Sequence, residues 1–204
     1  MVADIGAKNG IIPADEKAEK FLKGRTNKKF DLIKTDLDAE YFDILNIDIT
    51  QLEPYIAVPP LPDNVVPVRE LSDVKVNQVF LGSCTNGRYE DLEIGAKIVK
   101  GKKINSSVRL IVIPESQEIY KKAMDTWILN AFVEAGAIVG PPTCGPCHGG
   151  HLGLRANGEV TISSTNRNFE GRMGSKISKI YLSSPATVAA SALTGIITDP
   201  RDFL

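Results

Sequence analysis

Short apolar runs alternate with helical patterns of apolar residues over the second part of the chain, from about residue 72 onward. The runs predict buried strands, and the segments between them predict amphipathic helices. Strands that alternate with helices indicate a parallel sheet covered by helices on both sides. The expected fold class is therefore α/β, with three α/β/α layers and a mostly parallel sheet.

The predicted strands of this part span residues 78–82, 108–113, 137–139 and 179–182. The predicted helices span residues 88–99, 116–135 (one helix, or two with a joint near Thr126) and 185–193. The near-continuous apolar run at 108–113 is typical of a parallel strand buried on both faces. Pro185 suits a first helical position, which makes Ser183 or Ser184 the capping residue.

The first part of the chain has a different pattern. Residues 16–24 (EKAEKFLKG) predict a short helix, with Asp15 as its N-cap and Gly24 just past its end. Residues 41–49 (YFDILNIDI) alternate apolar and polar side chains, which predicts a strand. A partial α/β segment is therefore expected at the N-terminus.

Residues 53–68 contain five prolines. Proline lacks a backbone N–H and fixes φ, so this stretch should be an extended connector rather than a helix or a central strand. We therefore expect two domains, residues 1–65, which include the connector, and residues 66–204.

Composition restricts the class of protein. The chain has 204 residues, of which 43% are hydrophobic and 24% charged, as in an ordinary globular protein. Its formal net charge is −1, with no long run of one sign, which argues against nucleic acid or a polybasic membrane surface as the partner. No apolar stretch is long enough to span a membrane, and the first residues do not resemble a secretory signal, so a cytoplasmic protein is expected.

The three cysteines are the first residues that indicate a particular chemistry. An odd number, with Cys144 and Cys147 in a C-x-x-C, argues for a metal or redox site rather than a disulfide framework. Cys84 lies where a predicted strand ends, which is where open parallel sheets bind ligands. A [4Fe-4S] cluster usually takes four cysteines, so three would leave one iron open to act as a Lewis acid. The count therefore favours catalysis over electron transfer.

Spacing alone leaves several interpretations of these residues open. Cys144 and Cys147 could instead bind zinc with His148 and His151, or form a structural or redox pair. Cys84 alone could be a buried core thiol. Further along, Arg167 and Arg172 are either surface arginines or the forks of a carboxylate-binding pocket. Their Asn-rich setting after the cysteine turn favours the pocket.

Four segments together resemble the aconitase superfamily, and within it the large subunits of isopropylmalate isomerases and homoaconitases. In order, they are VFLGSCTNGRYEDLEIGAKIV, TCGPCHGG, STNRNFEGRMG and LSSPATVAASALTG. The similarity runs from about Asp4 to Leu204. It implies that residues 66–204 form the iron–sulfur domain of the aconitase type, and that residues 1–65 are the end of the preceding domain.

The resemblance also implies roles for single residues. Cys84, Cys144 and Cys147 match the family's three ligands of a [4Fe-4S] cluster. The other matches are Asn166, close to the cluster, Asn86 in a similar supporting role, Arg167 and Arg172 facing the substrate, and Asp4 near the active site. At the position of Asp4 the family has a glutamate, whose side chain is one methylene longer.

The implied reaction is the dehydration and rehydration of a hydroxy di- or tricarboxylic acid through a cis-alkene. A 3-isopropylmalate dehydratase is expected first, with homoaconitase or a methylmalate- or aconitate-type hydratase as alternatives. From another class of function, the chain could be a non-catalytic zinc or apo module that docks a partner.

The family's large chain begins with a further domain that carries aspartate–histidine pairs, and this sequence contains no Asp-His dipeptide. The family's alkoxide base comes from a swivelling domain, which in the isomerases is a separate small subunit. We therefore expect this chain to be inactive alone, with a missing N-terminal domain and a small swivel-domain subunit as partners, and a small hydroxy-polycarboxylate as substrate.

Overall fold

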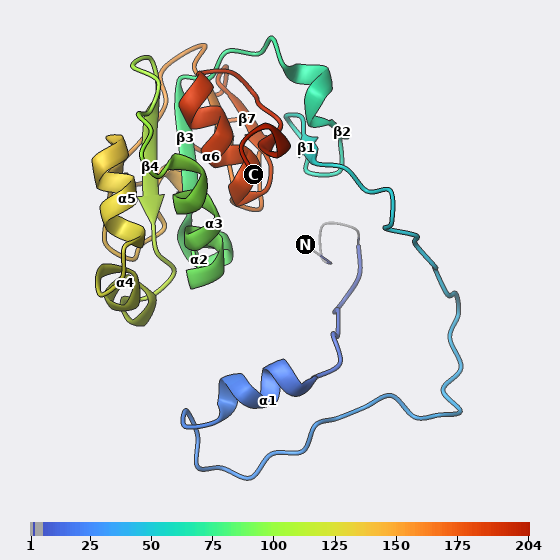
Figure 1. Ribbon diagram of the computed structural model, residues 1–204. Coiled ribbons are helices and arrows are strands. Elements are labelled where there is room, and N and C mark those ends of the chain that lie inside the picture. Colours follow the sequence, from blue (N-terminus) through green and yellow to red (C-terminus); the bar gives the residue numbers. More distant parts are fainter. Residues whose placement is uncertain (1, 3–5) are drawn as a thin grey trace. The chain divides into compact units, whose positions relative to one another are not determined.

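Residues 52–204 contain one seven-stranded sheet, with strand order β2-β1-β7-β6-β3-β4-β5 (Figure 1). The structure is a computed structural model that describes residue 2 and residues 6–204. The strands from β7 to β5 are mutually parallel, whereas β1 pairs antiparallel with both β2 and β7. The strands are β1 Tyr55–Ala57, β2 Val65–Pro67, β3 Gln78–Gly82, β4 Arg109–Ile113, β5 Ile138–Val139, β6 Val160–Ser163 and β7 Lys179–Leu182. The predicted α/β class with a mostly parallel sheet is confirmed.

Apart from the short helix after β3, which the sequence did not predict, the helices of this part begin and end close to the predicted positions. They are α2 Ser83–Asn86, α3 Tyr89–Val99, α4 Gln117–Met124, α5 Ile128–Ala135 and α6 Pro185–Thr194, with 3₁₀ turns η2 Val68–Leu71, η3 Gly145–His148 and η4 Pro200–Asp202. The segment at 116–135 forms two helices with a joint at residues 125–127, as the sequence allowed. Ser184 caps α6 by accepting a hydrogen bond from the Thr187 N–H.

The two faces of the sheet are covered differently. Side chains alternate along a strand, so Val79 and Leu81 face one side of β3 and Phe80 faces the other. The first side packs in one core with α3, α5 and α6. The second side packs against Cys147, Met173 and Leu152, which lie in loops and in η3. The third layer of the described structure is thus built from irregular segments where the sequence predicted helices, because the chain after β5 is rich in glycine and proline.

The proline-rich connector contains two strands that the sequence did not predict. Strands β1 and β2 form an antiparallel pair, and β1 joins the sheet through a single pairing of Ala57 with Leu182. Pro67 lies in β2, the outermost strand, where a missing N–H costs no ladder hydrogen bond. The structure divides the chain between Gln51 and Leu52, so the connector belongs to the second compact unit.

The first unit contains one predicted helix that formed and one predicted strand that did not. Helix α1 spans Glu16–Leu22, and the Asp15 carboxylate caps it by accepting hydrogen bonds from two backbone N–H groups. Residues 41–49 contain no strand, and Phe42 is fully exposed. The strand prediction is therefore wrong for this structure. A strand needs a partner for its backbone groups, and the described residues of this unit provide none.

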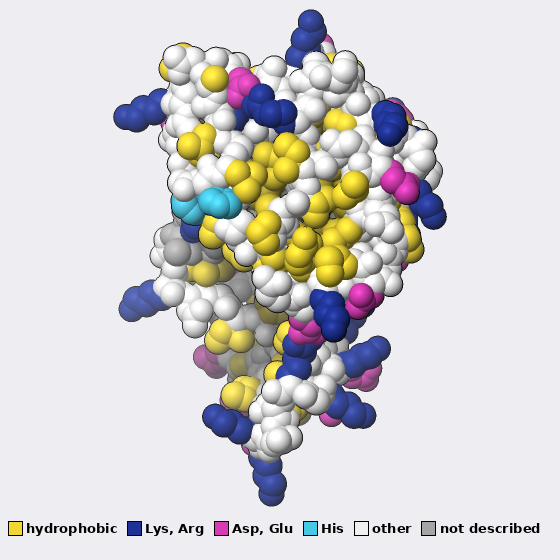
Figure 2. All heavy atoms as spheres, turned by 90° about the vertical axis from the view of Figure 1, so that its left-hand side faces the viewer, with side chains coloured by type: hydrophobic (Ala, Val, Ile, Leu, Met, Phe, Trp, Pro, Cys, Tyr) yellow, Lys and Arg dark blue, Asp and Glu magenta, His cyan; other side chains and the backbone are white. Residues whose placement is uncertain are grey.

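Apolar side chains also gather on one surface of the second unit. Figure 2 shows this surface on the side of the unit where α4 and α5 lie in Figure 1. Exposed apolar residues of these helices and of the edge strand β5 include Met124, Val133 and Ile138, each more than half exposed. Of the helices in the described part of the chain, none is long and apolar enough to cross a membrane.

Candidate functional site

The segments predicted from the sequence to form the site follow three strands of the parallel part of the sheet. Cys84 comes after β3, Cys144 and Cys147 come after β5, and residues 166–172 come after β6. Strands β6, β3, β4 and β5 are adjacent and parallel, so their carboxyl ends meet at one edge of the sheet. That edge is where open α/β sheets bind ligands.

The turn that carries Cys84 lies flat against the end of β4. A Cβ atom at Gly82 would lie 2.0 Å from the carbonyl oxygen of Ile113, and one at Gly87 would lie 2.7 Å from the same oxygen. The Gly82 N–H donates a hydrogen bond to Ser164 Oγ at 2.9 Å, which ties the turn to the end of β6. The two glycines therefore allow a close backbone approach that places the exposed Cys84 at the edge of the sheet.

Ser83 stands in an unusual conformation beside Cys84. It has φ of 70°, and among the described residues it is the one non-glycine residue with positive φ. Its side chain is buried, and its Oγ has no hydrogen-bond partner in the structure. Such strain costs about 1–3 kcal/mol and is concentrated at functional sites. Next to it, Asn86 Nδ2 donates to the Ser164 carbonyl and holds the other end of the turn.

The second cysteine turn packs under the sheet. Cys147 belongs to the same buried cluster as Phe80 and Ile113, whereas Cys144 is exposed. The Cys147 N–H donates to the Cys144 carbonyl at 3.0 Å, which closes the turn. Gly145 has φ of +52°, and a Cβ there would lie 3.3 Å from the Phe80 ring. All three cysteines are free thiols.

Arg172 connects the loop between β6 and β7 (residues 164–178, called the arginine loop) to this turn. Its Nε donates a hydrogen bond to the Cys147 carbonyl at 2.7 Å. Asn166 and Arg167 lie half-buried in the same loop, which begins where β6 ends. The fold thus brings Arg172 directly against a cysteine turn and places the other two predicted residues in the segment that leads to it.

A buried arginine that the sequence analysis did not select anchors the arginine loop. Arg155 is 4% exposed, and its Nη1 donates to the Lys179 carbonyl at 2.8 Å. Its main chain bonds to both sides of the loop, through the Met173 carbonyl and the Ser175 N–H. Burial lowers the pKa of Arg155 to about 10, so the guanidinium remains charged at neutral pH.

The zinc alternative finds no support in the arrangement of donors. In the part of the chain that the structure describes, no three His, Cys, Asp or Glu side chains are grouped so as to hold a metal ion. His148 and His151 are exposed beside the cysteine turn. A [4Fe-4S] cluster distributes its cysteines over different irons, so its ligands need not surround one ion.

One predicted residue, Asp4, lies outside the described residues. Two residues that shape the Cys84 turn, Ser83 and Ser164, were not predicted from the sequence. The run of three hydroxyl residues at 163–165, directly after an apolar strand, was the signal available for Ser164. Nothing in the sequence distinguished Ser83 from other residues before a cysteine.

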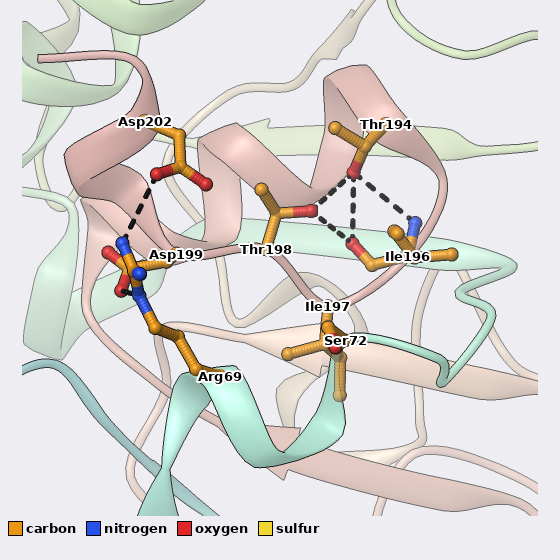
Figure 3. Close-up of a pocket in the computed structure, with 8 residues that line it drawn as sticks. All are labelled: Arg69, Ser72, Thr194, Ile196, Ile197, Thr198, Asp199 and Asp202. Carbon is orange, nitrogen blue, oxygen red and sulfur yellow. Dashed lines mark hydrogen bonds and ion pairs between the residues drawn. The ribbon is translucent and has the colours of Figure 1, made fainter.

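A pocket of about 360 Å³ lies at the other end of the sheet (Figure 3). Its lining residues are Arg69, Ser72, Thr194, Ile196, Ile197, Thr198, Asp199 and Asp202. The Val76 N–H donates to the Gly195 carbonyl, which places the pocket before the start of β3. Arg69 points at Asp199 and Asp202, with Nε 2.6 Å from the Asp199 carboxylate. These paired charges join the C-terminal turn to η2, which indicates a structural role.

The fold and the cysteine and arginine loops define the class of protein: the chain belongs to the aconitase family. The model of that family, described as aconitase family (aconitate hydratase), matches residues 1–74 and 69–195.

The names of individual relatives are more specific than the description of the family. The chain is 49% identical over 204 residues to the 3-isopropylmalate dehydratase large subunit 1 of Methanopyrus kandleri, covering 100% of this chain and 49% of that protein. It is 48% identical over 204 residues to the 3-isopropylmalate dehydratase large subunit of Clostridium kluyveri, again covering 100% of this chain and 49% of the relative. The corresponding subunit of Clostridium botulinum (strain Eklund 17B) is 50% identical over 201 residues, which are 98% of this chain and 48% of the relative. The chain spans about half the length of the curated relatives it matches.

Proposed function

We propose that this chain is the part of a hydro-lyase large subunit that binds a [4Fe-4S] cluster through Cys84, Cys144 and Cys147. The observation that supports the proposal is that three free thiols follow the carboxyl ends of two parallel strands, β3 and β5, in a member of the aconitase family. Cysteine thiolates are the usual protein ligands of such clusters.

The surroundings of the thiols fit such a group. Ser83 Oγ is buried and without a partner next to Cys84, so it can donate a hydrogen bond to a cluster sulfur or a ligand thiolate. Gly82 and Gly87 keep the backbone of this turn too close to β4 for any side chain. The turn is therefore held in one shape, as a site that must present a ligand accurately requires.

Cys84, Cys144 and Cys147 would hold three irons of the cluster, and the iron left without a cysteine would supply a Lewis acid for a substrate hydroxyl and carboxylate. The residues of this chain bind and orient the substrate. Arg167 and Arg172 present planar guanidinium forks that suit carboxylates. Arg172 uses only Nε for the Cys147 carbonyl, so its terminal N–H groups remain able to bind a substrate carboxylate.

The reaction removes a hydroxyl group and the proton on the adjacent carbon, which leaves an alkene and releases water. Adding water back with the opposite placement of hydroxyl and hydrogen gives the isomer. We propose 3-isopropylmalate as the substrate, because relatives of 48–50% identity are named 3-isopropylmalate dehydratase large subunit. Homoaconitate-, methylmalate- and aconitate-type acids are the alternatives, since they differ in one substituent.

The chain is proposed to act within a larger assembly. Its relatives are named large subunits, which supports a small subunit as partner, and each has about as many further residues as this chain matches. The apolar surface over α4 and α5 is suited to be covered by protein (Figure 2). A thiolate-bound cluster with an open iron is stable in a reducing compartment, so we place the assembly in the cytoplasm.

The test is an activity assay on the assembled enzyme. The chain is reconstituted anaerobically and combined with a small subunit and the unmatched half of the large subunit of the Methanopyrus kandleri relative. Ultraviolet absorbance then follows the unsaturated acid formed from each candidate hydroxy acid. We expect turnover of 3-isopropylmalate by the assembly and none by the chain alone. Preferential turnover of another acid would overturn the substrate, and one zinc per chain with no turnover would favour the docking module.

A further inference from the structure

We infer that Arg172 is a positioning residue that holds the Cys147 turn, so that a side chain expected to bind substrate also fixes a cluster ligand. The inference rests on the proposed function for the role of the cluster. The hydrogen bond between Arg172 and the Cys147 carbonyl forms within the chain and does not require a bound cluster.

The hydrogen bond between Arg172 Nε and the Cys147 carbonyl is short, at 2.7 Å, and its donor is charged. Charge-assisted hydrogen bonds are about twice as strong as neutral ones. The main-chain hydrogen bonds within the turn are local, from the Cys147 N–H to Cys144 and from the Gly149 N–H to Pro146. They shape the turn, whereas the bond from Arg172 ties it to a segment 25 residues away.

The two segments are also in close backbone contact. A Cβ at Gly149, just after the turn, would lie 2.9 Å from the Arg172 carbonyl oxygen and 3.4 Å from the Gly174 nitrogen. The arginine loop has its own anchor in Arg155, whose N–H and Nε both donate to the Met173 carbonyl. Arg172 therefore reaches the cysteine turn from a fixed position.

The contact couples two sites on one side chain. A carboxylate held by the terminal N–H groups of Arg172 would restrict the guanidinium and so stabilise its bond to the Cys147 carbonyl. Linkage then requires that binding of the carboxylate slows opening of the turn. In the loaded protein, the substrate should protect the cluster from loss, and this protection should depend on Arg172.

The direct experiment uses the apo chain and needs no cluster. Iodoacetamide alkylation is followed by mass spectrometry for each cysteine, since Cys147 is buried while Cys84 and Cys144 are exposed. In Arg172→Met, Cys147 should react about tenfold faster, because a charge-assisted bond that limits opening is lost. The alkylation rate of Cys84 should change less than twofold. Arg172→Lys keeps a charged donor, so it should restore part of the protection of Cys147.

Lys176→Gln is the matched control, because Lys176 is an exposed cation of the same loop and should leave all three rates unchanged. A Cys147 rate in Arg172→Met within twofold of the original chain would overturn the inference. If Arg172→Met loses its folded circular dichroism spectrum, the test uses Arg172→Lys instead. The alkylation rate of Cys147 in Arg172→Lys should then lie between that of the original chain and a tenfold increase, and a rate within twofold of the original chain would overturn the inference.

A second readout uses the reconstituted chain and an iron chelator. Iron should be lost about tenfold faster from Arg172→Met, and 3-isopropylmalate should slow the loss from the original chain but not from the variant. Equal loss rates and equal protection would contradict the coupling. Failure of the original chain to take up iron and sulfide would sink the proposed function, while the alkylation rates would still decide the contact.

Discussion

Gly82 shows most directly how single residues shape the site. It has φ of +114°, and a Cβ there would lie 2.0 Å from the Ile113 carbonyl oxygen. Both features follow from the backbone of one turn pressing against a neighbouring strand. A side chain at this position would push Cys84 away from the sheet edge.

We expect Gly82→Ala to lower the free energy of unfolding by about 3 kcal/mol or more, because backbone strain and a clash add together. Gly101→Ala is the control, since Gly101 also has positive φ (+71°) but open space around it. In Gly101→Ala, only the left-handed backbone conformation lowers the free energy of unfolding, by about 1–2 kcal/mol. Urea titrations of both variants measure the difference, and equal losses would contradict the close approach.

Site residues that lie in a short, recognisable motif could be predicted from the sequence. Cys144 and Cys147 sit in a C-x-x-C with turn-forming residues between them, so their placement could be predicted. Ser164 and Ser83 could not, because their importance depends on contacts across the sheet. Ser164 accepts from Gly82, 82 positions earlier in the chain, and spacing in one sequence does not show such a pair.

At the scale of elements, the success and failure of prediction follow the same physical rule. Helix α1 satisfies its backbone groups within itself and through Asp15, so a local pattern was enough to predict it. The strand expected at residues 41–49 depends on a neighbour that the described residues do not supply. Strands β1 and β2 were missed for the converse reason, because their pairing overrides the proline content of the connector.

The C-terminal turn η4 gives a pH-dependent prediction for how elements are held together. The Arg201 and Arg69 guanidiniums donate hydrogen bonds to the buried Asp199 carboxylate and hold its pKa below the ordinary value. A carboxylate with a lowered pKa in the folded state stabilises the fold at neutral pH. This contribution is lost as pH falls below about 4, the pKa of an unperturbed aspartate, toward the folded pKa.

We therefore expect the difference in free energy of unfolding between the original chain and Asp199→Asn to be constant above about pH 5 and to shrink on acidification. Denaturant titrations from pH 6 to pH 2.5 measure it. The shrinkage should be smaller in an Arg201→Gln background, because that substitution removes the first cause of the lowered pKa. A difference that does not vary with pH would contradict the assignment.

At the scale of the whole molecule, the two units differ in how much they bury. No side chain is buried in the described residues 6–51, whereas the second unit has a continuous core of strands and helices. A segment without buried contacts opens at little cost in free energy. The first unit should therefore be the more readily cleaved part of the free chain.

Limited digestion with thermolysin tests this expectation. Cuts should appear first between residues 41 and 52, where apolar side chains such as Phe42 and Leu45 are exposed. A product that begins near residue 52 and retains α3 and α6 should then persist. Cleavage within α3 at a comparable rate would contradict the division into a core unit and an unpacked segment.

The measurement that tests the central claim most directly is iron and sulfide analysis of the chain after anaerobic reconstitution. We predict about four irons and four sulfides per chain, with broad absorbance in the visible blue, and loss of both in a Cys84→Ser, Cys144→Ser double variant. Binding of one zinc without sulfide, or a cluster retained in full by the double variant, would contradict the assignment of the three cysteines.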